Sequence, residues 1–152
     1  MQKILFTIIS MLLISNINAQ SRFSSKELSV NGFRNPSIGL EYRKNHVSVH
    51  AGYYITALEA GITTKFFKAG VTTWFLPVGK KENPSSFYAG ASYLRGFNLD
   101  YEKTNALGLE AGFRWIVWEG LNLRIGAIAL VAEGHDVKIN PTPGISYSFI
   151  IK

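Results

Sequence analysis

The chain has 152 residues, a formal net charge of +6 and no cysteine, which excludes disulfides, cysteine-ligated zinc and a thiol nucleophile. Its basic residues are thinly spread, without the basic stripe that a nucleic-acid partner would require. Charged residues make up 17% of the chain, compared with about 25% in a typical soluble domain, whereas 47% of its residues are hydrophobic.

The N-terminal residues predict export. Lys3 gives a positive start, residues 4–14 form a short apolar segment, and Ala19 provides a small residue for cleavage. A membrane-spanning helix needs about 20 apolar residues, which is more than this segment contains. We therefore expect residues 1–19 to be a signal peptide that is removed from the mature chain.

The rest of the chain is long enough for a single domain. We expect residues 35–152 to form it, because hydrophobic residues alternate with polar or small residues from there onward. Residues 20–34 have two interpretations, a periplasmic tail or part of an extra strand.

Alternation with period two, together with many aromatic and β-branched residues, predicts strands rather than helices. In residues 107–117, for example, Leu109 and Phe113 fall on one face, while Glu110 and Arg114 fall on the other. We expect eight strands, which together would make an all-β, antiparallel up-and-down barrel: residues 36–43, 46–56, 58–67, 70–78, 86–95, 106–117, 121–131 and 143–151.

A tight turn sets the expected register at the first hairpin. A two-residue loop at residues 44–45 would pair Arg43 with His46 and keep both on the polar face. The fourth strand has two phases that fit equally, one with Val71 facing outward and one with Trp74 facing outward.

The sixth and seventh strands are joined by a short turn. A three-residue loop at residues 118–120 would pair Val117 with Leu121 and place a glycine where the backbone is left-handed. The two longer connections, residues 96–105 and 132–142, follow the fifth and seventh strands, so they share one end of the barrel with the loop at residues 44–45.

The polar face of the strands is rich in glycine and serine, which indicates that it lines the interior. The lumen of an eight-stranded barrel is just wide enough for side chains to fill, so small residues are expected there. The apolar face would then meet lipid. We expect six of its aromatic side chains to contribute to girdles at the membrane boundaries: Tyr42, Tyr53, Phe113, Trp115, Tyr147 and Phe149.

Ionisable residues also occur on the polar face. In a dry lumen each of them must be paired and hydrogen-bonded, because an isolated buried charge is costly. We therefore expect a structural ion-pair network rather than an open pore, made by Glu41, Arg43, His50, Glu59, Lys65, Glu110, Arg114 and Arg124.

On these patterns, residues 35–152 resemble the small eight-stranded outer-membrane β-barrel proteins of Gram-negative bacteria. The resemblance implies contact with outer-membrane lipid, lipopolysaccharide or phospholipid, and insertion by the barrel-assembly machinery. That machinery favours a terminal strand ending in an aromatic residue, and Phe149 approximates this signal, followed by residues 150–152.

Two short motifs bear on catalysis. His46 and Ser48 have a spacing similar to the His-x-Ser pair of outer-membrane lipid A deacylases, but their phase points both side chains into the lumen. Gly134-His135-Asp136 has no accompanying nucleophile and is typical of a solvated loop. Neither a glycine-rich phosphate loop nor metal-ligand spacing occurs, so we expect no catalytic residue, cofactor or metal.

The leading functional hypothesis is a non-enzymatic outer-membrane barrel whose loops, residues 96–105 and 132–142, present a surface for an extracellular partner. A second hypothesis is a lipid-A-modifying outer-membrane enzyme. A third is a soluble periplasmic barrel that binds an apolar ligand inside.

Overall fold

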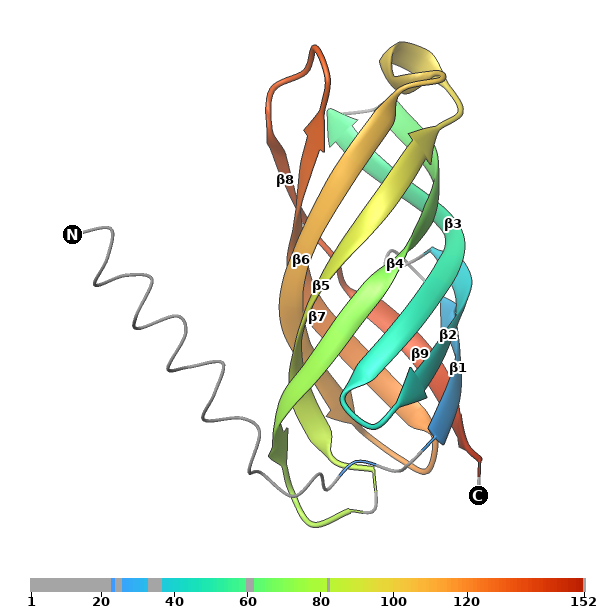
Figure 1. Ribbon diagram of the computed structural model, residues 1–152, viewed down its shortest axis with the longest axis vertical. Helices are drawn as coiled ribbons and strands as arrows, with labels where there is room; N and C mark the ends of the chain where they lie inside the picture. Colours follow the sequence, from blue (N-terminus) through green and yellow to red (C-terminus); the bar gives the residue numbers. More distant parts are fainter. Residues whose placement is uncertain (1–22, 24–25, 33–36, 60–61, 82, 152) are drawn as a thin grey trace, which may run out of the picture.

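The computed structural model describes residues 23, 26–32, 37–59, 62–81 and 83–151, so the expected signal peptide lies outside the described residues. Antiparallel strands curl into a barrel (Figure 1), with one short 3-10 helix, η1, at Leu99–Tyr101. Among the described residues, no helix has the length and apolar character needed to cross a membrane. The strands are β1 (Lys26–Gly32), β2 (Ile38–Lys44), β3 (Val47–Glu59), β4 (Ile62–Val78), β5 (Ser85–Gly96), β6 (Asn105–Ile116), β7 (Leu121–Ala132), β8 (Lys138–Pro141) and β9 (Gly144–Ile150).

The barrel is closed by pairing between the first and last strands. Each strand from β1 to β7 pairs with the next, β7 pairs with β9, and β9 pairs with β1. β8 pairs with the second half of β7 and continues the position of β9 in the wall, with a bend at Thr142 and Pro143 between them. The predicted eight-stranded antiparallel barrel is therefore confirmed.

Two of the strand predictions are wrong. One error adds a strand and the other removes one, so the predicted number of strands in the wall is still correct. The barrel begins at β1, before residue 35, so part of the 20–34 segment is a strand. The strands expected at residues 58–67 and 70–78 are not two strands: residues 58–59 belong to β3, and Ile62–Val78 form the single 17-residue strand β4. Lys68 does not interrupt this strand, because its side chain points into the lumen, where an acidic partner meets it.

The connections sort into two ends (Figure 1). One end, here called the turn end, carries the short connections at residues 45–46, 79–84 and 117–120 together with the C-terminus. The other, the loop end, carries residues 97–104 and 133–137. The first hairpin therefore lies opposite the long loops and not beside them, because β4 is one strand where two were expected, which leaves three strands between the hairpin and the 97–104 loop. The predicted loop 132–142 also contains β8.

Of the two hairpin registers predicted from the sequence, the first is wrong and the second is confirmed. Lys44 pairs with Val47, and Arg43 pairs with Ser48 rather than His46, because the loop is residues 45–46, where Asn45 takes a left-handed backbone (φ 54°). The β6–β7 register is confirmed: the Val117 N–H donates to the Leu121 carbonyl at 3.0 Å.

The barrel wall is shorter on the side formed by β1, β2 and β9. Beyond the end of β2, side chains form hydrogen bonds with the backbone of β3 in place of a neighbouring strand. β1, β2 and β9 have seven residues each, whereas β3 has 13. Beyond β2, the Ser37 hydroxyl accepts from the Ile55 N–H at 2.6 Å, and the Asn140 amide donates to the Ala57 carbonyl at 3.4 Å. These contacts satisfy backbone groups of β3 that lie beyond the end of its pairing with β2 at Tyr53.

Candidate functional site

The strongest concentration of charge lies inside the turn end, around Glu27. Its side chain is 1% exposed and forms ion pairs with Arg43 and, at 2.7 Å, with Arg114. Asn83 folds in from the β4–β5 turn, donates to Glu27 Oε2 at 2.7 Å, and accepts from the Arg43 and Arg114 guanidinium groups at 2.9 and 3.2 Å. One carboxylate and one amide thus hold two buried arginines in place, and the carboxylate balances one of their two charges.

A third ion pair, formed by Glu41, lies beside the two that Glu27 makes. Arg124 Nη2 is 2.7 Å from Glu41 Oε2, and the Ser48 hydroxyl donates to Glu41 Oε1 at 2.5 Å. Trp74 donates from its indole N–H to the Ser48 hydroxyl at 2.9 Å, and its ring lies 4.3 Å from the guanidinium carbon of Arg114 and 5.0 Å from that of Arg124. The Trp74 ring therefore lies within cation–π distance of two like charges and attracts both of them.

A fourth ion pair occupies the middle of the lumen. Lys68 Nζ is 2.6 Å from Glu110 Oε2, and both side chains are buried. His50 lies on the same level, with its Nε2 3.0 Å from the Ser92 hydroxyl and its Nδ1 3.3 Å from the Thr72 hydroxyl. Both ring nitrogens thus have partners in the polar packing of the lumen.

The loop half of the lumen has a different filling, here called the apolar plug. Tyr101 of η1 packs over Phe66 with ring centroids 5.4 Å apart, and His135 of the β7–β8 loop stacks on Tyr101 at 4.3 Å. The two long connections therefore contact each other over the barrel mouth. The plug consists of Tyr54, Phe66, Leu94, Tyr101, Ala106, Ile128, Leu130 and Ala132.

Glycines on the lumen face provide room for large side chains. A Cβ on Gly112 or Gly126 would lie 2.7 Å from the Tyr88 hydroxyl, and one on Gly108 would lie 2.8 Å from side-chain atoms of Leu94 and Ile128. The small residues of the polar face are thus placed where the lumen is tightest.

The structure places most of the predicted lumenal residues inside the barrel. The prediction for Lys65 is wrong: its side chain is exposed on the outer face. Lys68, three residues later, points inward instead. The side chain of Glu59 lies outside the described residues. The predicted residues that are buried are Glu41, Arg43, His50, Glu110, Arg114 and Arg124.

Besides Lys68, sequence reasoning missed two central members of the network. Glu27 belongs to a short alternating stretch in which Leu28 and Val30 point outward, so its phase was readable from the sequence. Asn83 had no such signal, because it reaches the lumen from an irregular turn.

The outer face carries the predicted aromatic residues and fixes the phase of β4. Tyr42, Trp115, Tyr147 and Phe149 are exposed, and Tyr53 and Phe113 are partly exposed. Of the two phases considered for β4, the structure has Val71 and Thr73 outward, while Trp74 is 1% exposed inside.

Neither catalytic motif forms a catalytic arrangement. His46 Nδ1 contacts the Trp74 carbonyl at 3.0 Å, while the Ser48 hydroxyl donates to Glu41. His135 Nδ1 contacts the Glu133 carbonyl at 2.9 Å within its own loop, and Asp136 is exposed. Within the described ranges, no group of three or more His, Asp or Glu side chains is placed to hold a metal ion.

No protein family, curated protein or solved structure matches the chain in the comparisons. The site is therefore defined by its geometry alone. Three carboxylates, Glu27, Glu41 and Glu110, face four cations in a packed lumen: Arg43, Lys68, Arg114 and Arg124.

Proposed function

We propose that the chain is a small, exported outer-membrane β-barrel protein with a non-enzymatic structural or surface-interaction role. The observation that carries this proposal is the distribution of side chains across the barrel wall. The ion pairs lie inside, whereas large apolar side chains such as Ile125 (69% exposed) and Trp115 (57% exposed) cover the outside. In water such a surface would drive aggregation, whereas lipid tails would match it.

The height of the apolar surface supports the same proposal. Along β6 and into its turn, outward side chains from Leu107 to Val117 cover about 33 Å at about 3.3 Å per residue. At a typical strand tilt of about 40°, this corresponds to an apolar band about 25 Å tall, as in outer-membrane barrels. Polar groups follow at the loop end, where Tyr93 and Arg95 donate to the Asn105 side chain.

The loop end supplies the surface proposed for an extracellular partner. Phe97 (49% exposed), Leu99 (54%) and Val137 (58%) are large apolar side chains on residues 96–105 and 132–142. They project from connections that are held together by the contact between Tyr101 and His135. We propose that this surface, and not the lumen, makes contact with a partner.

The test of location combines membrane fractionation with heat-modifiable migration. The full chain should float with outer membranes in a density gradient, and unheated samples should migrate faster on a denaturing gel than boiled ones, because the closed barrel resists detergent. A stable, detergent-free soluble fraction would contradict the proposal. Lipid A should be unchanged by expression of the chain, and altered lipid A would contradict the non-enzymatic role.

A further inference from the structure

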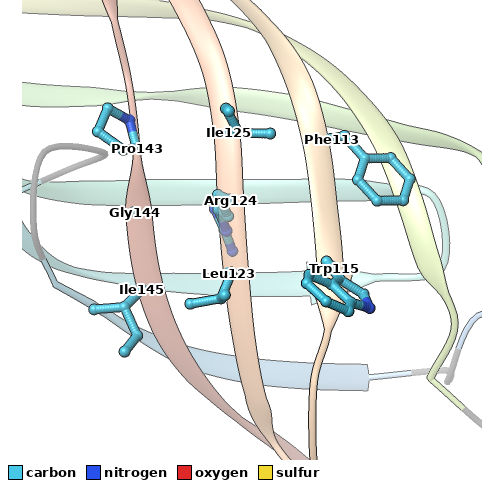
Figure 2. Close-up of a pocket in the computed structure, with 8 residues that line it drawn as sticks. All are labelled: Phe113, Trp115, Leu123, Arg124, Ile125, Pro143, Gly144 and Ile145. Carbon is cyan, nitrogen blue, oxygen red and sulfur yellow. The ribbon is translucent and has the colours of Figure 1, made fainter.

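The outer wall is hollowed beside the bend between β8 and β9. Figure 2 shows the groove, with side chains of β6 on one side, of β7 in the middle, and of the β9 region on the other. Its volume is about 490 Å³, within the range of about 300–1,000 Å³ typical of ligand pockets. Arg124 also lines the groove, but its guanidinium group is paired with Glu41 inside the barrel. The other side chains that line it are apolar: Phe113, Trp115, Leu123, Ile125, Pro143 and Ile145.

The bend explains why the groove forms there. Pro143 has no N–H to donate to the β-ladder, and the pairing with β7 is interrupted there, between the Ala127–Pro141 pair of β8 and the Arg124–Gly144 pair of β9. The wall is therefore recessed between Ile125 and Ile145.

A second hollow of about 410 Å³ continues the groove toward the turn end. The two share Phe113 and Trp115, and the second is lined by Lys80 and Lys81 of the β4–β5 turn. Lys81 Nζ donates to the Ile116 carbonyl at 3.1 Å, which fixes its ammonium group at the lower edge of the groove. The apolar groove, or trough, thus ends at the side chains of Lys80 and Lys81.

We propose that this groove binds an anionic phospholipid, with one acyl chain along the trough and the phosphate at Lys80 and Lys81. The inference rests on the proposed membrane location. The chemistry selects this occupant, because an uncharged hydrocarbon would leave the lysines unused and a free phosphate would leave the trough empty. Short turns face the periplasm in barrels of this kind, so the site lies in the phospholipid leaflet.

The test uses quenching of Trp115 fluorescence in vesicles. A Trp118→Phe background leaves Trp115 in the groove, while Trp74 is enclosed in the lumen. Zwitterionic vesicles contain a minor fraction of phospholipid with brominated acyl chains, either anionic or zwitterionic. We expect the anionic lipid to quench more strongly at equal fraction. The preference should fall about fivefold for each lysine replaced by Lys80→Gln or Lys81→Gln.

A matched control uses Lys26→Gln and Lys44→Gln. These two exposed lysines lie opposite each other in the register of β1 and β2, at the same end of the barrel as the groove. These variants should retain the preference. Leu123→Phe, which fills the trough, should reduce quenching by the anionic lipid while both lysines remain.

The outcomes separate the two proposals. Equal quenching by both brominated lipids in the parent protein would overturn the lipid site but leave membrane insertion intact. Quenching by neither would overturn the membrane location and the site together. Loss of preference in the Lys26 and Lys44 variants would reduce the effect to general surface charge and would also overturn the site.

Discussion

Inside the loop half, the barrel is filled by packed rings and aliphatic chains such as Phe66 and Leu94, whereas the turn half is filled by ion pairs centred on Glu27. Both halves are buried, yet their stability has different origins. The apolar plug gains from many small contacts that are lost one at a time. The charged half depends on complete pairing, because one missing partner leaves a buried charge uncompensated. The lumen of one barrel can therefore be filled in two ways: by apolar contacts that contribute to stability separately, or by an indivisible unit of charges that stabilises the barrel only when all of them are paired.

The largest effect is expected for Glu27→Gln. This change removes the carboxylate shared by Arg43 and Arg114 and leaves two buried cations facing each other. We expect the free energy of unfolding to fall by about 5 kcal/mol. Urea titration of the protein folded in detergent measures it, with Lys26→Gln on the adjacent outward position as the control. A loss below about 1 kcal/mol, the scale of an exposed pair, would contradict the indivisible unit.

Lys68→Gln tests a single ion pair at the boundary between the halves. Glu110 would be left without its cation, and we expect a loss of about 4 kcal/mol. Lys65→Gln, three residues earlier on the outer face, should leave the unfolding midpoint unchanged. Equal effects of the two substitutions would show that Lys68 is not the lumenal cation.

Leu94→Ala tests the apolar plug. Leu94 is fully buried, and its truncation creates a cavity, for which we expect a loss of about 3 kcal/mol. Ile128→Val, which removes a single methyl group from the same plug, should cost about 1 kcal/mol. A loss for Leu94→Ala as large as that for Glu27→Gln would remove the contrast with the charged half.

Gly112→Ala and Gly108→Ala compare the space available in the two halves. A Cβ on Gly112 would lie 2.4 Å from the Ile125 carbonyl oxygen, a backbone atom that moves only with the strand. A Cβ on Gly108 would meet the ends of two flexible side chains. We expect a cost of about 2 kcal/mol for Gly112→Ala and less for Gly108→Ala, measured by the same urea titration. The reverse order would contradict the packing described for the two halves.

The smallest effect is expected for His135→Ala. Its ring stacks on Tyr101, which covers the plug, so its loss should cost about 1 kcal/mol. The local consequence is larger: backbone amides of residues 97–104 should exchange faster with deuterium, while those of the turn end should not change. Unchanged exchange in both regions would show that the two loops are held independently.

The barrel was predictable where long strands alternate strictly. Leu109, Phe113 and Trp115 face outward and Glu110 and Arg114 face inward, as the period-two pattern of β6 indicated. The pattern works there because each side chain meets one of two environments, and a shift of one residue would expose every charge.

Prediction failed where closure of the barrel decides the outcome. β1 is only seven residues long, and its place between β2 and β9 depends on a strand more than a hundred residues away. Lys65 and Lys68 lie three positions apart on one strand and therefore on opposite faces, and the sequence alone left the phase of this strand open; Lys68 is the one that meets Glu110. Asn83 enters the lumen from a turn, where no periodicity applies. The groove beside Pro143 is likewise a property of three neighbouring strands.

The pairing of β1 with β9 also bears on how the molecule forms. The Ser29 and Ser148 hydroxyls lie 2.8 Å apart although 119 positions separate them in the chain, and Glu27 meets Arg114 across 87 positions. Contacts at such separation form late and slowly, because the loop they close is long. As the chain folds, β2 can already pair with β1 and supply Arg43 to Glu27, but the other edge of β1 and the second arginine, Arg114, meet their partners only after most of the chain is present. The rate-limiting step of assembly is therefore expected to be the meeting of the two outermost strands, at which point the wall and its central ion pairs are completed together.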